Sequence, residues 1–119
     1  MKVAVTSQGR DLDSAVDPRF GRAAYILIVD SDDETFEVLD NSENVNAFKG
    51  AGIQAAATVA DKGADVLLTG YCGPKAFQTL AAAGVKVAND ASGTVKEALQ
   101  AFKNGKLVFA DGANVDGHW

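Results

Sequence analysis

The sequence feature that most constrains the fold is a near-continuous apolar run, AYILIV, at residues 24–29. The run is rich in residues that favour β-structure, and its length is that of a strand. A strand without polar positions is typical of a sheet that is covered on both faces. The run therefore predicts an α/β domain in which helices pack on a central sheet.

Four further segments have strand-like patterns, and one of them, residues 35–39, alternates between polar and apolar side chains. The expected strands are residues 2–7, 24–29, 35–39, 65–69 and 85–88. The acidic turn at residues 30–34 predicts that the second and third strands pair antiparallel.

Three segments change to helical spacing. A first helix is predicted up to about Gly63, with one apolar face formed by Phe48, Ile53, Ala56, Ala57 and Ala60. Pro74 predicts the first turn of a second helix, which a glycine ends. Thr94 and Glu97 have the spacing of a capping box, and they predict a third helix through about Lys103. The order β-β-β-α-β-α-β-α indicates a mixed five-stranded sheet with helices on both faces.

Length and composition indicate one globular domain. The chain has 119 residues, of which 47% are hydrophobic and 23% charged, so it can bury a core. We expect the domain to span residues 1–110, and the polar, glycine-rich residues 111–119 to form a flexible C-terminal tail. The first residues enter a strand pattern directly, and no apolar run reaches the roughly 20 residues of a membrane span, which predicts a cytoplasmic location. The net charge of −5 argues against binding to nucleic acid or to an anionic membrane.

Topology predicts a ligand site at one edge of the sheet. In open α/β sheets, ligands bind beyond the carboxyl ends of the parallel strands. The loop after the first strand should meet three helix starts there, at residues 46–52, 70–75 and 90–94. Helix starts offer backbone N–H groups and partial positive charge, and glycines let a ligand approach the backbone closely. Together these segments predict an anion-binding cradle, although each glycine could equally end an element for structural reasons.

The loop Asp17–Arg22 is the most unusual stretch, because it places two arginines beside an aromatic residue in an acidic chain. Arg19 and Arg22 present planar forks of N–H donors that suit an anion. Phe20 would either cover a ligand or fix the loop to the sheet. The alternative for the arginines is a set of salt bridges with nearby acids such as Asp11, Asp13 or Asp17.

The single cysteine and the single histidine are candidate metal ligands. Cys72 lies between a strand end and a helix start, where the helix N-terminus would lower the pKa of its thiol and favour a soft-metal ligand. The alternative is a buried thiol that fills space in the core. His118 would reach the site only if the tail folds back, with Trp119 docking it; otherwise it is solvated.

Several common catalytic patterns are absent from the sequence. The first strand carries no carboxylate of the kind that two-metal nucleases need, and there is no Walker A lysine motif, Gly-x-Ser-x-Gly elbow or Cys-x-x-Cys pair. One cysteine also cannot supply the four thiolates of an ordinary protein-ligated iron–sulfur cluster. These patterns therefore give no candidate catalytic residues.

Four segments, which follow one another along nearly the whole chain, carry a resemblance to a known family: residues 12–22, 50–56, 69–76 and 93–98. They resemble the dinitrogenase iron–molybdenum cofactor biosynthesis family, which includes NifX-like carriers of nitrogenase cofactor precursors. The resemblance implies a ribonuclease H-like three-layer fold without nuclease activity. Family members that carry nitrogenase cofactor use a histidine elsewhere in the chain, and this sequence has none there.

Within that family, the Asp17–Arg22 run, residues 72–74 and the tail up to His118 are more closely similar to the orange proteins of sulfate-reducing bacteria. Those proteins hold a molybdenum–copper sulfide cluster without covalent attachment. The resemblance therefore implies a non-enzymatic binder or carrier of an anionic metal–sulfur cluster, with an iron–molybdenum cofactor precursor as the alternative cargo. The implied partners are that cluster and other proteins of a complex or delivery pathway.

The predicted site combines the topology with this resemblance. The expected cofactor-binding residues are Arg19, Phe20, Arg22, Gly50, Gly52, Gly73, Lys75 and Thr94, and the candidate metal ligands are Cys72 and His118. Two other functions remain open from the residues alone. The same cradle would suit a phosphorylated metabolite or nucleotide, held by a binding protein or a small enzyme, and the domain would alternatively act as a partner-binding module.

Overall fold

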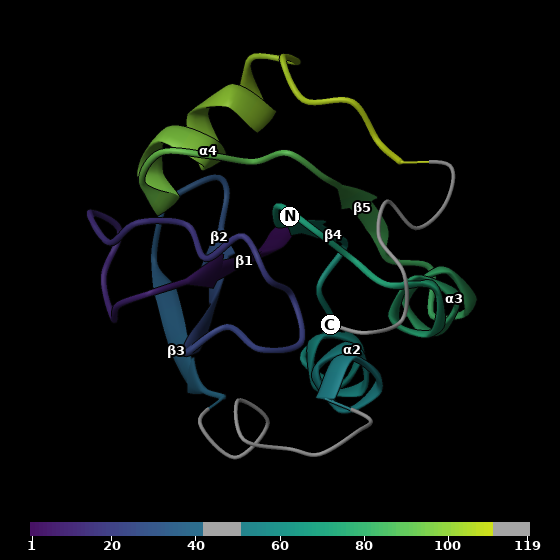
Figure 1. Ribbon diagram of the computed structural model, residues 1–119. Helices are drawn as coiled ribbons and strands as arrows, with labels where there is room; N and C mark the ends of the chain where they lie inside the picture. Colours follow the sequence, from purple (N-terminus) through teal and green to yellow (C-terminus); the bar gives the residue numbers. More distant parts are fainter. Residues whose placement is uncertain (42–50, 111–119) are drawn as a thin grey trace.

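The structure, a computed structural model, describes residues 1–41 and 51–110. Its centre is a five-stranded sheet with the strand order β3-β2-β1-β4-β5 (Figure 1). The strands are β1 (Lys2–Ser7), β2 (Tyr25–Asp30), β3 (Phe36–Asp40), β4 (Val66–Leu68) and β5 (Lys86–Ala88). The helices are α2 (Ala51–Asp61), α3 (Pro74–Ala82) and α4 (Val95–Lys103). This element order is the predicted one.

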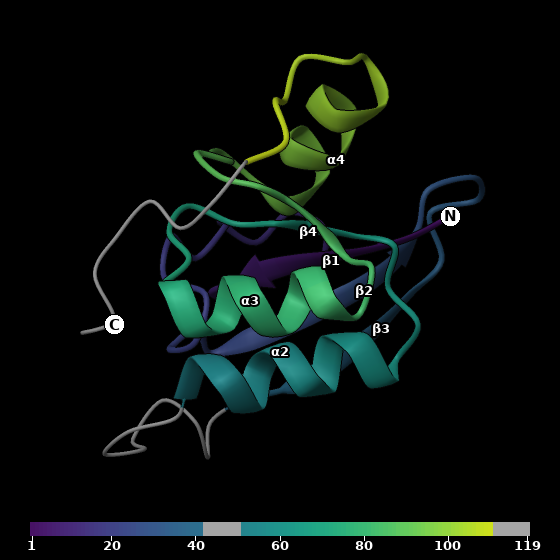
Figure 2. The same ribbon diagram turned by 90° about the vertical axis from the view of Figure 1, so that its right-hand side faces the viewer.

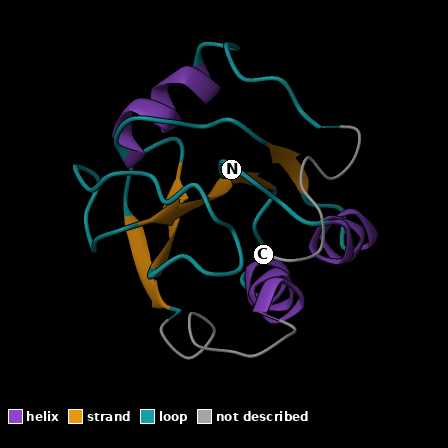
Figure 3. Ribbon diagram, in the orientation of Figure 1, coloured by secondary structure: helices purple, strands orange, loops and turns teal. Residues whose placement is uncertain are grey.

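The sheet is mixed, as the sequence predicts. β1 pairs antiparallel with β2, and β2 pairs antiparallel with β3. On its other side β1 pairs parallel with β4, and β4 pairs parallel with β5. The carboxyl ends of these three parallel strands, at Ser7, Leu68 and Ala88, therefore lie together at what we call the carboxyl edge. Figure 2 shows β1 pointing toward the end at which α2 and α3 begin, and Figure 3 separates the sheet from the surrounding loops.

Different helices cover the two faces of the sheet, so the domain has three layers (Figure 2). Successive strand residues point to opposite faces. Ile26 and Ile28 join the core under α2 and α3, whereas Leu27 and Val29 join the core under α4. These four side chains are at most 5% exposed. The prediction of a strand that is buried on both faces is confirmed for this part of β2.

The buried face of α2 differs from the predicted one. Phe48 lies outside the described residues, while Ile53 is 41% exposed and Ala57 is exposed. Of the predicted face, Ala56 is buried, and the helix also buries Ala51, Ala55 and Val59. Small side chains on this face let α2 lie close to α3 as well as to the sheet, and a Cβ on Gly52 would come within 3.2 Å of the Ala76 Cβ. The hydrophobic pattern of the sequence alone does not predict that α2 packs against α3 in addition to the sheet.

Helix ends follow the predicted signals. Gly84, just after α3, has a φ of 80°, which glycine adopts without strain. Thr94 caps α4 through a complete capping box with Glu97. The antiparallel bridge between Phe109 and Ala88 of β5 was not predicted. Across the described ranges, no helix has the length and apolar character that a membrane crossing requires.

Candidate functional site

Residues 8–24 form a long connection between β1 and β2, here called the edge loop, which crosses the carboxyl edge of the sheet. The edge loop meets the starts of three helices. It bridges Thr94 before α4 and Tyr71 before α3, and it packs against Gly52 in the first turn of α2. The prediction that this loop and these helix starts come together at one edge is confirmed for the described residues.

At the start of α4, the backbone N–H groups of the first turn are already hydrogen-bonded within the protein. The N–H groups of Val95 and Lys96 donate to carbonyl oxygens of the edge loop, each at 2.9 Å. The Glu97 N–H donates to the Thr94 hydroxyl at 3.1 Å, and the Thr94 N–H donates to the Glu97 carboxylate at 2.9 Å. An anion would need these same N–H groups. The start of α4 therefore differs from the expected open cradle, because its N–H groups are bonded within the protein. Thr94 is a helix cap, and its role in cofactor binding stays a prediction.

Before α3, the edge loop forms a short parallel ladder with the segment that follows β4. The Phe20 N–H donates to the Tyr71 carbonyl at 3.1 Å, and the Tyr71 N–H donates to the Pro18 carbonyl at 2.6 Å. A Cβ on Gly70 would lie 2.7 Å from the Pro18 backbone. The two segments can therefore come this close only because residue 70 is glycine.

The start of α3 lies directly after this ladder. Its N-cap is Gly73, with φ −75° and ψ 169°, and glycine has no side chain with which to cap the helix. Pro74 has no N–H, so the first turn presents the N–H groups of Lys75 and Ala76 toward the carboxyl edge. The Lys75 side chain is exposed. The predicted residues Gly73 and Lys75 thus lie together beside the edge loop.

At α2, the end of the edge loop packs on the first turn of the helix. A Cβ on Gly21 would lie 2.6 Å from the Gly52 nitrogen and 2.7 Å from its Cα, so the two backbones are in direct contact. The buried Asn41 donates from Nδ2 to the carbonyl of Gly21 at 3.2 Å and to that of Ala23 at 2.8 Å. Gly52 therefore serves chain packing here, and the predicted Gly50 lies outside the described residues.

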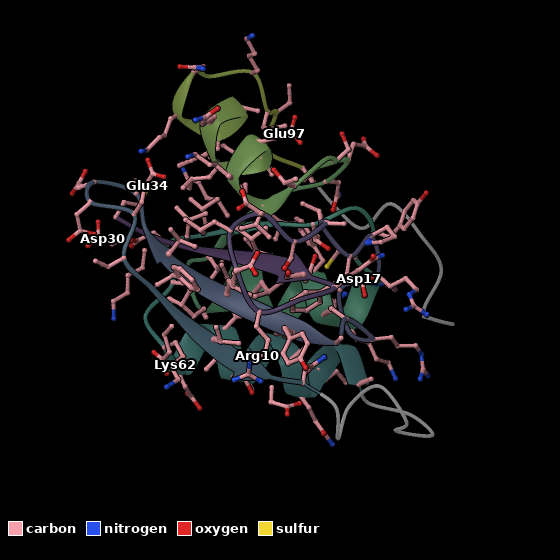
Figure 4. All side chains as sticks on the ribbon, turned by 90° about the vertical axis from the view of Figure 1, so that its left-hand side faces the viewer. Arg10, Asp17, Asp30, Glu34, Lys62 and Glu97 are labelled. Carbon is pink, nitrogen blue, oxygen red and sulfur yellow. The ribbon has the colours of Figure 1, made fainter. Side chains whose placement is uncertain are left out.

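Arg19 lies in the edge loop with its side chain half exposed. Its N–H donates to Asp17 Oδ1 at 3.0 Å, and its Nε lies 3.5 Å from the same oxygen. The Arg19 side chain is 46% exposed and that of Asp17 only 4%, and Figure 4 shows Asp17 at the end of the sheet opposite Asp30. The predicted salt bridge with Asp17 is confirmed, and it leaves part of the guanidinium fork accessible to a ligand. Arg22 is half-buried.

Phe20 fixes the edge loop to the protein. The residue is 1% exposed and belongs to the core under α2 and α3. Of the two roles predicted for it, the structure supports the fixing one. This corrects its place among the cofactor-binding residues, because a buried ring has no surface with which to cover a ligand.

Cys72 is buried in the same core as Phe20. Burial raises the pKa of its thiol from an ordinary value of 9.0 to about 12. Its Sγ lies 3.7 Å from the Gly73 carbonyl oxygen, to which the thiol donates a weak hydrogen bond. This corrects the expectation of a lowered pKa at the helix start, because loss of solvent outweighs the favourable helix terminus. The other candidate metal ligand, His118, lies outside the described residues.

We expect Cys72 to make the free energy of unfolding fall as the pH rises above about 9. The unfolded chain releases the thiol proton near pH 9.0, whereas burial holds the pKa of the folded protein at about 12. Between these values the folded state binds the extra proton, so a rise in pH favours unfolding by at most about 1.4 kcal/mol per pH unit. Urea unfolding over this pH range would measure the slope. A Cys72→Ala variant should have a flatter profile, and equal slopes would contradict the raised pKa.

Sequence reasoning missed buried polar residues that hold the edge loop, among them Thr6, Thr69 and Asn41. Thr6 and Thr69 are 0% exposed and Asn41 is 6% exposed. Thr6 and Asn41 bind backbone groups of the edge loop, and Thr69 binds the Thr6 hydroxyl. Each of them lies at or just after the end of a strand. A polar residue at the end of a predicted strand was therefore the sequence feature that could have indicated these contacts.

Comparison with known proteins places the chain in a family. Residues 1–105 match the model of the dinitrogenase iron-molybdenum cofactor family. The chain belongs to this family. The family resemblance expected from the sequence motifs is thereby confirmed.

Solved structures agree with this assignment. The apo form of the orange protein from Desulfovibrio gigas is 50% identical, with a TM-score of 0.93 and 96% of each chain covered. A putative NifB protein from Thermotoga is 41% identical, with a TM-score of 0.79 and 91% of each chain covered. Among protein sequences, an uncharacterized protein of Methanocaldococcus jannaschii is 26% identical over 110 residues, which are 90% of this chain and 89% of that protein.

Proposed function

We propose that this member of the dinitrogenase iron-molybdenum cofactor family binds or carries an anionic metal–sulfur cluster and catalyses no reaction. The preferred cargo is a molybdenum–copper sulfide cluster, and an iron–molybdenum cofactor precursor is the alternative. The observation that carries the proposal is the position of Arg19. A backbone ladder fixes its main chain beside the segment that leads into the uncapped start of α3, and its side chain is half exposed. The similarity to the orange protein supports the choice of cargo.

The available donors fit a cluster that brings its own ligands. Within residues 1–41 and 51–110, no three histidine, cysteine, aspartate or glutamate side chains gather as a set that could hold a metal ion. Cys72 is buried, and its thiol has a raised pKa. In a thiometallate, sulfide ions already bind the metal atoms. The protein then has to supply N–H donors and positive charge to the outer sulfur atoms.

The carboxyl edge supplies such groups from two neighbouring segments. Arg19 contributes part of its guanidinium fork, and α3 contributes its first-turn N–H groups and the charge of Lys75. Tyr71, which is in register with Arg19 and 39% exposed, offers an aromatic surface beside them. In a chain with a net charge of −5, this local positive group decides where an anion binds. Arg22, Gly50 and His118 remain proposed contacts.

Anaerobic reconstitution tests the proposal. The protein is mixed with tetrathiomolybdate and a copper(I) salt, passed over a gel-filtration column and examined by visible absorption and metal analysis. We expect a chromophore that elutes with the protein and contains both metals. Absence of a retained chromophore, with the fold shown intact by circular dichroism, would contradict the proposal. A thermal-shift screen adds a second criterion, because stabilisation by nucleotides but not by thiometallates would favour a phosphate-binding function instead.

Three finer assignments accompany this proposal. The strand order, with an antiparallel β1-β2-β3 half and parallel β4 and β5, supports a ribonuclease H-like assignment of the fold. We also propose that residues 1–110 make up the domain, followed by a flexible tail at residues 111–119. A cytoplasmic location is proposed as well, where such a carrier would meet its delivery partners.

A further inference from the structure

Two buried threonines connect the sheet to the segment that carries Arg19. Thr6 of β1 and Thr69, which follows β4, are each 0% exposed, and Asp17 is 3% exposed. The Thr6 Oγ1 lies 2.6 Å from the Asp17 carbonyl oxygen and 2.9 Å from the Thr69 Oγ1. The Asp17 N–H also donates to the Thr6 carbonyl at 3.0 Å. Thr6 therefore binds both backbone polar groups of Asp17.

The direction of these hydrogen bonds follows from the chemistry of the groups. A carbonyl oxygen can only accept, and a hydroxyl has one proton to donate. Thr6 must therefore donate to the Asp17 carbonyl, and Thr69 must donate to the Thr6 oxygen. Asp17 then transmits the constraint to Arg19, because its carboxylate accepts the Arg19 N–H at 3.0 Å. The chain of contacts thus runs from Thr69 through Thr6 and Asp17 to Arg19.

Core packing does not account for threonine at these two positions. Valine has nearly the same shape and would fill the same space without a hydroxyl to desolvate. A buried hydroxyl is unfavourable unless it is hydrogen-bonded. Both hydroxyls are bonded here: that of Thr6 binds the edge loop at Asp17, and that of Thr69 binds the Thr6 hydroxyl. The hydroxyls of Thr6 and Thr69 therefore contribute by holding the loop.

We propose that Thr6 and Thr69 are positioning residues for the cluster site. They set the location of Arg19 by clamping Asp17 to the carboxyl ends of β1 and β4. Thr6 makes the direct contact, and Thr69 orients the Thr6 hydroxyl toward Asp17. The ligand-binding consequence rests on the proposed function, whereas the positioning of the loop is testable without any ligand.

Amide hydrogen exchange of the ligand-free protein, followed by NMR, tests the positioning. Thr6→Val should speed the exchange of the Arg19 amide about tenfold, because one hydrogen bond to the loop is lost. Thr69→Val should have a smaller effect, about threefold, because the Thr6 contact survives. Thr6→Ser keeps the hydroxyl and should behave like wild type. Thr58→Val, on the exposed side of α2, is the matched control and should leave this amide unchanged.

The relative sizes of the changes in Arg19 amide exchange in Thr6→Val and Thr69→Val decide the proposal. A Thr69→Val effect that equals or exceeds that of Thr6→Val, or unchanged exchange of Arg19 in both variants, overturns it. If Thr6→Val does not fold, the comparison of Thr69→Val with Thr69→Ser decides, since only the serine variant should match wild type.

Cluster retention by the same variants is the second measurement. Retention of the tetrathiomolybdate–copper chromophore should fall about tenfold in Thr6→Val and be restored in Thr6→Ser. Retention that is unchanged in Thr6→Val would overturn the role in ligand binding. If wild type itself retains no chromophore, the proposed function fails, while the exchange of the Arg19 amide still decides the positioning.

Discussion

Replacing Gly21 with alanine should lower the free energy of unfolding by about 3 kcal/mol. The new methyl group would lie 2.6 Å from the Gly52 nitrogen and 2.7 Å from its Cα. Both are backbone atoms that cannot rotate away, so the edge loop or the first turn of α2 has to move. Thermal unfolding followed by circular dichroism should show a melting temperature lower by roughly 10 °C.

Two other glycines serve as controls for this substitution. Gly63 has a φ of +75° and nothing within 4 Å of an added Cβ, so Gly63→Ala should cost only the conformational strain of about 1 kcal/mol. Gly52→Ala should cost less than Gly21→Ala, because its Cβ would meet only the Ala76 Cβ, at 3.2 Å, and alanine is favoured in a helix. If Gly21→Ala is no more destabilising than Gly63→Ala, the direct contact between the loop and α2 is wrong.

Replacing Arg19 with alanine should weaken retention of the metal–sulfur cluster by about tenfold to a hundredfold, the effect of one charge-assisted contact. The fold should persist, because the ladder with Tyr71 uses backbone groups of Pro18 and Phe20 rather than the arginine side chain. Arg19→Lys should give an intermediate loss, since lysine keeps the charge but not the planar fork. Titration with the tetrathiomolybdate–copper cluster, followed by visible absorption, measures these differences.

Lys62→Ala provides the charge-matched control. Lys62 follows α2, at the end of the sheet away from the carboxyl edge, and its Nζ lies 2.6 Å from the Glu37 carboxylate. Its removal changes the net charge by the same amount as Arg19→Ala. Equal losses in the two variants would mean that overall charge, rather than a local site, holds the cluster. Added salt should reduce the difference between wild type and Arg19→Ala, because it screens exposed charges.

Most of the fold was predictable because its signals are local. The apolar run at residues 24–29, the proline at the start of α3 and the capping box of Thr94 each act within a few residues. The buried face of α2 was predicted only in part, because it depends on a second helix. Ile53 is the largest apolar residue described in α2, yet it is 41% exposed, since the close approach to α3 selects small side chains.

The location of the site was predictable from the sequence, but the residues that form it were less predictable. Strand order puts the edge loop beside the helix starts, and that part of the prediction is confirmed. Hydrogen bonds within the folded protein then decide which N–H groups remain available for a ligand. At α4, such bonds to the edge loop and to the capping box occupy the N–H groups of the first turn. For Cys72 the sequence shows the helix start, which would lower the thiol pKa, but not the burial, which raises it. Competing effects of this kind need the tertiary structure.

The way the edge loop bridges the starts of three helices has a consequence for folding kinetics. Its contacts with Gly52, Tyr71 and Thr94 join parts of the chain that are far apart in sequence. Such contacts form late, because the intervening chain must first be ordered. The anion site that we propose at Arg19 and the start of α3 therefore forms only after the edge loop has docked on the parallel strands. Under the proposed function, only chains folded to that stage would bind the cargo, and an earlier folding intermediate would not compete for it.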